Sequence, residues 1–219
     1  MGTIYSTASM SLDGFIASDD DDPGALFDWY QAGCVPVATA MESVSFRLTE
    51  PSAAYVRELT SRLGALVVGR RLFDVTDGWK GRHPYDVPVV VVTHAPPGGW
   101  AYPGAENFTF VTDGVAAAVA RARDLAGERD VSVAAGEVAT QALAAGLLDE
   151  VRIDLVPVVL GAGRPYFTGG VTHLLGEPTM SIQAARVTHL AYPGVETGLA
   201  ALLAEVVAQD RQHARARGA

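Results

Sequence analysis

Residues 64–74, GALVVGRRLFD, give the clearest indication of the architecture of this chain. The consecutive apolar residues ALVV are typical of a strand that is buried on both faces of a sheet. The run ends abruptly in Gly69 and the adjacent Arg70 and Arg71. Because burial of an unpaired guanidinium is costly, we expect both arginines to lie at the rim, where the strand leaves the core.

Short runs rich in β-branched residues predict the other strands. They lie at residues 3–8, 87–93, 107–111 and 131–134, and two longer runs follow at 151–160 and 181–190. No helix separates the last two runs, so we expect them to form an antiparallel edge of the sheet. Residues 33–47 show no clear period, and the acidic residues 19–24 predict a solvated loop.

Helical segments alternate with these strands, and capping residues mark their ends. The first helix has apolar residues at i, i+3 and i+7, with Thr49 or Ser52 as its N-cap and Gly64 as its stop. Asp113 can cap a second helix, which ends at Gly127, and a third runs from about residue 137 to 145. This alternation predicts an α/β fold with a largely parallel sheet that helices cover on both faces.

Composition limits the classes of function. The chain has 219 residues, 49% of them hydrophobic, which is enough for one sizeable α/β domain. Its net charge of -9 argues against nonspecific binding to nucleic acid or to anionic membranes. The single cysteine, Cys34, cannot form an intrachain disulfide, and no spacing of Cys or His predicts a metal site. Without a signal peptide or an apolar membrane span, we expect a cytoplasmic protein.

The segment that contains Gly69, Arg70 and Arg71 is the first candidate for binding a ligand. A strand that passes through glycine into a helix directs free backbone N–H groups at the space above the strand, and two guanidinium groups add bidentate donors for phosphate. The alternative is that Arg70 pairs with a carboxylate such as Asp74 or Asp77 and only closes the start of the helix.

Two further strand ends are candidates. Ala135 and Gly136 connect a strand directly to a helix, so the small residues either admit a ligand to the helix amides or serve close packing. Thr93 and His94 follow the strand VVVV, where they either contact a ribose phosphate or lie in a solvated loop. The segment LGAGRP predicts a turn rather than a phosphate loop, with Arg164 able to reach a substrate.

Five motifs in this order resemble the dihydrofolate-reductase-like proteins, which include the reductase domain of riboflavin biosynthesis: SMSLDGFIA, GALVVGRRLFD, VPVVVVTHAPP, VAAGEVATQALAAGLLDEV and VPVVLGAGRPYF. The resemblance covers residues 3–192. It implies a three-layer α/β/α fold with a mixed, mostly parallel sheet of about eight strands and a C-terminal antiparallel edge. We therefore expect one domain over residues 1–192 and a partly helical C-terminal extension over residues 193–219.

The resemblance also implies NADPH bound across the strand ends. Gly69, Arg70, Arg71 and Leu72 match the phosphate-binding segment beside the adenosine, and Thr93 and His94 match the strand end that contacts its 2′-phosphate. The pyrophosphate segment corresponds to Ala135, Gly136, Glu137 and Val138, where the family commonly has more glycines. Residues that lie against the nicotinamide correspond to Ala8 and Ile16, with Asp13 and Gly14 in the loop that closes over it.

The activity that these resemblances imply is hydride transfer from NADPH to a C=N or C=O bond of a small pteridine-like, pyrimidine-like or related substrate. Asp28, in LFDWY, matches the carboxylic acid that protonates the substrate, because Phe27 and Trp29 can keep its carboxyl protonated; its alternative role is an N-cap or a surface acid. Residues 25–48 and Trp79 would supply the substrate pocket, and the family resemblance implies a homodimer.

Two other hypotheses remain open. The first is a nucleotide-binding module of the same fold without reductase catalysis. The second is an interaction protein that uses the C-terminal helix.

Overall fold

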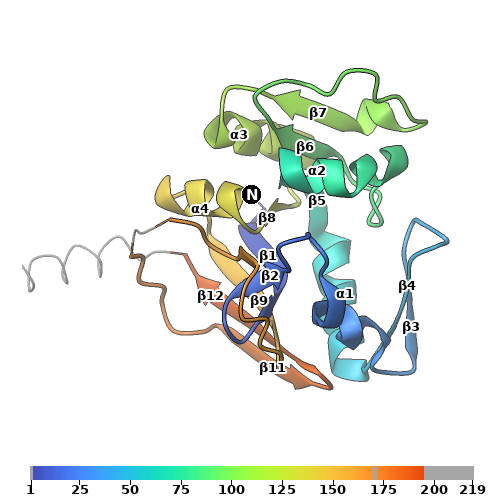
Figure 1. The fold of residues 1–219 in the computed structure, drawn as a ribbon, viewed down its shortest axis with the longest axis vertical. Coiled ribbons are helices and arrows are strands. Elements are labelled where there is room, and N and C mark those ends of the chain that lie inside the picture. The colour runs from blue at the N-terminus through green and yellow to red at the C-terminus, as the bar shows by residue number, and fades with distance from the viewer. Residues whose placement is uncertain (1, 170–171, 195–219) are drawn as a thin grey trace, which may run out of the picture.

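Strand β5 (Leu63–Gly69) lies inside the central sheet, parallel to β8 (Asp130–Ala134) on one side and to β6 (Val89–Val92) on the other. The computed structural model describes residues 2–169 and 172–194, and its eight-stranded sheet has the order β11-β12-β9-β1-β8-β5-β6-β7 (Figure 1). The other strands of this sheet are β1 (Ile4–Ser11), β7 (Phe108–Val111), β9 (Glu150–Val156), β11 (Met180–Ala184) and β12 (Val187–Pro193).

Strands β1, β5, β6, β7, β8 and β9 run parallel, while β12 is antiparallel to both β9 and β11. The expected mixed, mostly parallel sheet with a C-terminal antiparallel edge is thus confirmed. Two small antiparallel pairs lie outside it, β2 (Phe15–Ala17) with β10 (Arg164–Pro165) and β3 (Val35–Ala38) with β4 (Ser45–Leu48).

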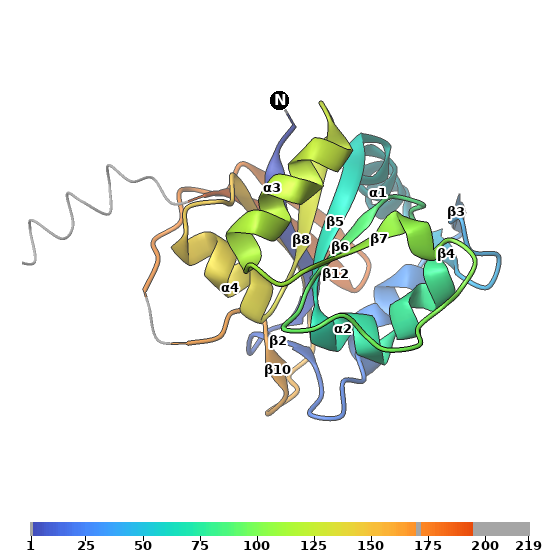
Figure 2. The ribbon, with the colours of Figure 1, turned by 90° about the horizontal axis from the view of Figure 1, so that it is seen from above.

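Helices cover both faces of the sheet, as Figure 2 shows. On one side, α3 (Val115–Ala126) and α4 (Glu137–Ala144) bury apolar residues of the central strands together with Tyr166. On the other side lie α1 (Glu50–Arg62), α2 (Arg70–Val75) and the 3₁₀ helices η1 (Gly24–Gln31) and η2 (Asp77–Gly81); a third, η3 (Ala105–Asn107), precedes β7. Each consecutive apolar residue of β5 therefore meets a helix layer, which explains why the strand shows no polar alternation.

The C-terminal run at residues 181–190 is a hairpin and not the single strand that its apolar pattern predicts. Strands β11 and β12 pair with Ala184 opposite Val187, and the chain turns between them with Arg186 at a φ of 64°. The turn contains no Gly, Asn or Asp, so the usual signal is missing. The predicted strand at residues 151–160 ends earlier, at Val156, because Pro157 has no N–H for the ladder.

Three local predictions are also wrong. Residues 33–47 contain most of the β3–β4 hairpin rather than irregular structure. Helix α1 ends at Arg62, and Gly64 lies within β5, where a Cβ would come within 2.7 Å of the Cβ of Ala126. This glycine permits close packing and does not stop the helix. The N-cap of α3 is Gly114, so Asp113 does not cap it.

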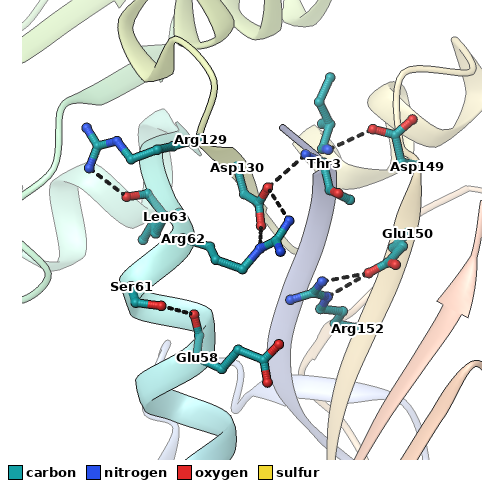
Figure 3. A network of polar contacts seen from close by, with 11 residues as sticks. Thr3, Glu58, Ser61, Arg62, Leu63, Arg129, Asp130, Asp149, Glu150 and Arg152 are labelled. Carbon is teal, nitrogen blue, oxygen red and sulfur yellow. Dashed lines mark hydrogen bonds and ion pairs between the residues drawn. The ribbon is translucent and has the colours of Figure 1, made fainter. Parts of the chain in front are cut away.

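A polar network connects the amino ends of the central strands (Figure 3). Asp130, only 2% exposed, accepts hydrogen bonds from the backbone N–H of Thr3 and from the guanidinium of Arg62 at 2.9 Å and 3.3 Å. Asp149 accepts the N–H of Ile4. These contacts join the end of α1 to β1, β8 and β9.

Within residues 2–169 and 172–194, no helix is long and apolar enough to cross a membrane, and no group of His, Cys, Asp and Glu has the arrangement of a metal site. Cys34 is exposed and unpaired with another cysteine. The predicted C-terminal extension falls almost wholly outside the described residues, so its helix and the domain limits at 192 and 193 stay predictions.

Candidate functional site

A cavity of about 1020 Å³ opens where β5, β6 and β8 end, and it continues along the face of the sheet that α1 and η1 cover. All residues that the sequence predicts for cofactor binding line it: Ala8, Ile16, Gly69, Arg70, Arg71, Leu72, Thr93, His94, Ala135, Gly136, Glu137 and Val138. Parallel strands bring their carboxyl ends to one edge, which is the physical reason that segments so distant in the sequence meet here.

Two helix starts converge in this cavity. Gly69 is the N-cap of α2 and Gly136 is the N-cap of α4. A Cβ on Gly69 would lie only 3.1 Å from Cγ2 of Val138, in the first turn of α4, so the two segments pack against each other. The first N–H groups of both helices have no partner within their helix and are available to an anion.

Arg70 spans two strand ends. Its Nε donates to Asp74 at 2.7 Å, and its Nη1 donates to the carbonyl of Ala95 at 2.8 Å and, at 3.4 Å, to Oγ1 of Thr93. The ion pair with Asp74 is one of the two alternatives that the sequence left open. It coexists with a position in the cavity wall, where the guanidinium links the start of α2 to the loop after β6.

The sequence predicts a solvated acidic loop at residues 19–24, but in the structure this loop also forms ion pairs. Asp21 accepts a bidentate pair of hydrogen bonds from Arg71, both at 2.7 Å, and another from Arg164 at 3.1 Å. The arginines lower the pKa of Asp21, with the hydrogen bond from Arg71 as the largest cause. Asp21, Arg71 and Arg164 all line the cavity, so these ion pairs form part of its wall.

Gly136 has a backbone conformation that favours glycine. Its φ is 92° and its ψ is -147°, a combination that side chains rarely adopt, and no atom lies within 4 Å of the position of a Cβ. Its own N–H donates to the carbonyl of Tyr166 at 2.7 Å, so the donors left for an anion are the next amides of α4. The side of Gly136 that a Cβ would fill is an open cradle.

We expect Gly136→Ala to destabilise the protein by about 1–3 kcal/mol, because alanine strongly disfavours this backbone conformation. Urea unfolding measures the change. Gly98→Ala is the matched control, since it too has open space around the Cβ but no positive φ. Equal stability of the two variants would contradict the strain at Gly136.

Asp28 does not join the other predicted residues. Its side chain is about half exposed and accepts a hydrogen bond from Arg186 at 3.1 Å, while its neighbours Phe27 and Trp29 line the cavity. The turn of η1 directs these side chains to different sides. The predicted role of Asp28 as proton donor therefore has no support from the geometry, and its alternative as a surface acid describes its position.

A second set of polar residues lies deeper, on three adjacent strands. Asp154 of β9 lies opposite Ser9 of β1 and opposite His189 of β12. His189 is fully buried, with Nδ1 at 2.6 Å from Asp154 and Nε2 at 2.9 Å from the hydroxyl of Ser52. The indole N–H of Trp29 donates to Ser9 at 2.9 Å. Of these residues, Ser9, Trp29 and Asp154 line the cavity.

Asp154 and His189 are functional-site candidates that were not predicted from the sequence. A signal for them was present, because Arg152 and Asp154 alternate with apolar residues in RIDLV and must share one face of a strand. What the alternation does not reveal is that this face is the one that α1 covers. Within the predicted substrate segment, several residues line the cavity together with Trp79: Phe27, Tyr30, Met41, Val44 and Phe46.

Burial keeps the aromatic residues of this deeper region uncharged. Burial raises the pKa of Tyr5, Tyr30 and Tyr55 well above the usual range and that of Tyr85 to about 12. Burial also lowers the pKa of His83 to about 3, and its Nδ1 accepts the N–H of Tyr85. Near neutral pH these phenols and this imidazole are neutral.

Comparison with known proteins adds family information. The model of the RibD C-terminal domain family matches residues 2–190. A riboflavin biosynthesis protein from Shewanella sp. PV-4 has a similar structure, with a TM-score of 0.63, 22% identity, and coverage of 88% of this chain and 98% of that one. Dihydrofolate reductase from Enterococcus faecalis, solved with NADP(H), has a TM-score of 0.55 and 13% identity, with coverage of 88% of this chain and 96% of that one.

A third structure is the deaminase and 5-amino-6-(5-phosphoribosylamino)uracil reductase of Thermotoga maritima, with a TM-score of 0.57, 14% identity and coverage of 88% of this chain. Only 56% of the Thermotoga chain is covered, so the present chain spans about half of its length. No match was found among curated proteins. At these identities the solved structures establish the dihydrofolate-reductase-like fold.

Proposed function

This chain belongs to the RibD C-terminal domain family, and we propose that it is an NADPH-dependent reductase that transfers hydride to a C=N or C=O bond of a small heterocyclic substrate. The observation that carries the proposal is the convergence of two glycine-capped helix starts and the Arg70 guanidinium on one large cavity. Structural relatives are reductases, and one was solved with NADP(H).

The residues of this chain fit a phosphorylated dinucleotide. The cradle at Gly136 leaves room for a pyrophosphate at the start of α4, and Arg70, Thr93 and His94 would surround the adenosine 2′-phosphate. Leu72, an exposed apolar residue of α2, would pack on the adenosine. Ala8 and Ile16 would lie against the nicotinamide, and the short pair of β2 with β10 would hold Ile16 in place.

When bound, NADPH would supply the hydride. The protein would orient the acceptor beside Ala8 and exclude water, for which the aromatic walls of the deeper cavity are suited. Asp28 lies outside this space, so the proton that completes the reduction would have another source. The position of Asp13 supports a closing role for the loop after β1, because its carboxylate accepts the N–H groups of Leu160 and Gly161.

Titration with NADPH, NADH and a flavin, monitored by ligand fluorescence, tests the proposal. We expect saturable binding of NADPH that is tighter than binding of NADH, because only NADPH carries the 2′-phosphate. Oxidation of bound NADPH by a substrate panel that includes dihydrofolate then separates a reductase from a nucleotide-binding module without catalysis. Failure to bind any dinucleotide would refute the proposal.

The carboxylate of Glu137 opposes anion binding at the start of α4. Hydrogen bonds from Gln141 and Thr168 lower the pKa of Glu137, so it is ionised near neutral pH. We expect Glu137→Gln to tighten NADPH binding by about two- to fivefold, since a like charge leaves the phosphate site. Fluorescence titration measures this, with Glu106→Gln as a control in η3; weaker or unchanged binding in Glu137→Gln would contradict it.

Two other properties stay predictions. Strand β11 forms one edge of the sheet, so its outer hydrogen-bonding groups have no strand beside them among the described residues. Such an edge is commonly protected, which supports the predicted homodimer, and sedimentation velocity would test it. A cytoplasmic location is consistent with the family but follows from no feature of the structure.

A further inference from the structure

The acidic loop between β2 and η1 is held against the cavity wall by two arginines. Oδ1 of Asp21 accepts hydrogen bonds from Nε of Arg71 at 2.7 Å and from Nε of Arg164 at 3.1 Å, and Oδ2 accepts one from Nη2 of Arg71 at 2.7 Å. All three side chains line the cavity. Two guanidinium groups thus meet one carboxylate, so the group keeps an excess of positive charge.

The carboxylate of Asp21 occupies the donors that an anionic ligand would need. The paired Nε and Nη2 donors of an arginine bind a phosphate in the same bidentate way as they bind a carboxylate. Both of these donors of Arg71 are taken by Asp21. The Arg71 side chain is nevertheless 59% exposed, so a ligand in the cavity can approach it. Asp21 is ionised near neutral pH, because the hydrogen bond from Arg71 lowers its pKa.

Asp21 can leave these arginines without any change in the central sheet. Within the loop its hydrogen bonds are local, since its N–H donates to the carbonyl of Ser18 at 3.1 Å and the N–H of Ser18 donates to the carbonyl of Asp22 at 2.9 Å. The φ of Asp21 is 65°, a left-handed conformation that costs free energy in any residue with a side chain. The bidentate contact with Arg71 is therefore what holds this strained residue against α2.

Arg164 is anchored independently of Asp21. It lies in β10 opposite Ala17 of β2, and its Nη2 donates to the carbonyl of Asp19 at 2.8 Å. The neighbouring turn is tightly packed, because a Cβ on Gly163 would lie 2.1 Å from the carbonyl oxygen of Ala17. Arg164 would keep its place in the cavity wall when the carboxylate moves away, and such preorganised donors favour binding of a second anion.

We propose that Asp21 is the built-in occupant of an anion site formed by Arg71 and Arg164, and that the phosphate group of a ligand displaces it. Phosphate makes the same bidentate contact as the carboxylate and carries more negative charge. Because the carboxylate has to be released first, Asp21 lowers the affinity of the site and selects phosphates over singly charged anions. The inference does not depend on the reductase function; where that function holds, the phosphate belongs to the cofactor or to the substrate.

Calorimetric titration with inorganic pyrophosphate tests the competition. Asp21→Asn removes the competing charge, so it should tighten the binding of pyrophosphate by about three- to tenfold. The matched control is Asp20→Asn, which removes the same charge one residue away, from an exposed side chain that does not line the cavity. Equal gains in the two variants would overturn the proposal, because only the total charge of the loop would then matter. Unchanged or weaker binding in Asp21→Asn would also overturn it.

A double-mutant cycle tests whether the gain depends on Arg71. Arg71→Ala alone should weaken the binding of pyrophosphate by about tenfold, because a bidentate donor is lost. When Asp21→Asn is added to Arg71→Ala, the further gain should be at most about twofold, since the carboxylate no longer competes for that guanidinium. The full three- to tenfold gain in the absence of Arg71 would overturn the displacement.

Ribose 5-phosphate identifies which ligand supplies the phosphate. It is titrated against the wild type and Arg71→Ala, with and without saturating NADP⁺. If NADP⁺ abolishes the binding that depends on Arg71, the site takes a phosphate of the cofactor. If this binding persists beside NADP⁺, the site takes the phosphate of a substrate. Absence of any binding of ribose 5-phosphate or pyrophosphate that depends on Arg71 would overturn the proposal.

The same titrations separate this inference from the reductase proposal. If NADPH does not bind while Asp21→Asn still tightens pyrophosphate through Arg71, the reductase proposal fails and this inference stands. If NADPH binds and is oxidised by a substrate while Asp21→Asn leaves pyrophosphate binding unchanged, the reductase proposal stands and this inference fails.

Discussion

Replacement of Arg70 by alanine is expected to weaken NADPH binding by about 10- to 100-fold, the loss typical of a charge-assisted hydrogen bond to phosphate. The guanidinium lies between the start of α2 and the loop after β6, within reach of Thr93 and the carbonyl of Ala95. Binding of NADH should change much less, because NADH has no 2′-phosphate. The variant should therefore lose most of its preference for NADPH.

Fluorescence titration of both dinucleotides measures this preference. Arg121→Ala is the matched control, since it removes an exposed arginine from α3 that does not line the cavity. Folding should be little affected, because the ion pair of Arg70 with Asp74 is exposed on both sides and such pairs contribute about 0–1 kcal/mol. If Arg70→Ala retains the preference for NADPH, the 2′-phosphate does not bind at this strand end.

Replacement of Asp130 by asparagine is expected to destabilise the protein by about 2–3 kcal/mol. It removes the charge of a buried carboxylate, which pairs with the half-exposed Arg62 and accepts a backbone N–H. The carboxylate joins Arg62 at the end of α1 to the N–H of Thr3 at the start of β1 (Figure 3). Urea unfolding measures the loss, and Glu42→Gln, an exposed carboxylate away from the network, is the control. A loss below that of the control variant would contradict a structural role for this network.

The same pair predicts how stability depends on pH. Burial acts to raise the pKa of Asp130, but hydrogen bonds from Arg62 and Thr3 outweigh it and lower the pKa below its usual range. A lowered pKa in the folded state gives stabilisation that is complete above the pKa of an unfolded aspartate, about 3.9, and is lost as the pH falls through the folded value. Wild type should therefore lose more stability than Asp130→Asn between neutral pH and that acid range.

The site positions that the sequence can predict are those that follow from strand ends. An apolar run that ends in GRR must place its arginines outside the core, and Arg70 and Arg71 do lie at the cavity rim. Six strands are parallel, so their carboxyl ends lie at the same edge of the sheet. This follows from the strand directions alone and requires no information about tertiary contacts. The same reasoning does not apply to Asp28, which lies in a 3₁₀ helix and not at a strand end. The direction of its side chain depends on packing and could not be predicted from the sequence.

The local errors also have physical causes. The turn between β11 and β12 places Arg186 in a left-handed conformation. Turn preferences assign that conformation to Gly, Asn or Asp, so they do not predict a turn here. Gly64 looks like a helix stop but is needed because β5 passes close to Ala126. In both cases the reason lies in a neighbour that is remote in the sequence.

The amino-acid sequence alone determines the α/β class, the parallel order of its elements and the rim position of the phosphate-binding candidates, because these depend on periodicity, capping and the cost of burying charge. Only the tertiary structure decides that Asp154, His189 and Ser52 form one buried chain and that Tyr5 and Tyr55 keep hydroxyls without partners. These residues come from four separate elements, and their meeting depends on strand register and on how α1 packs across the sheet.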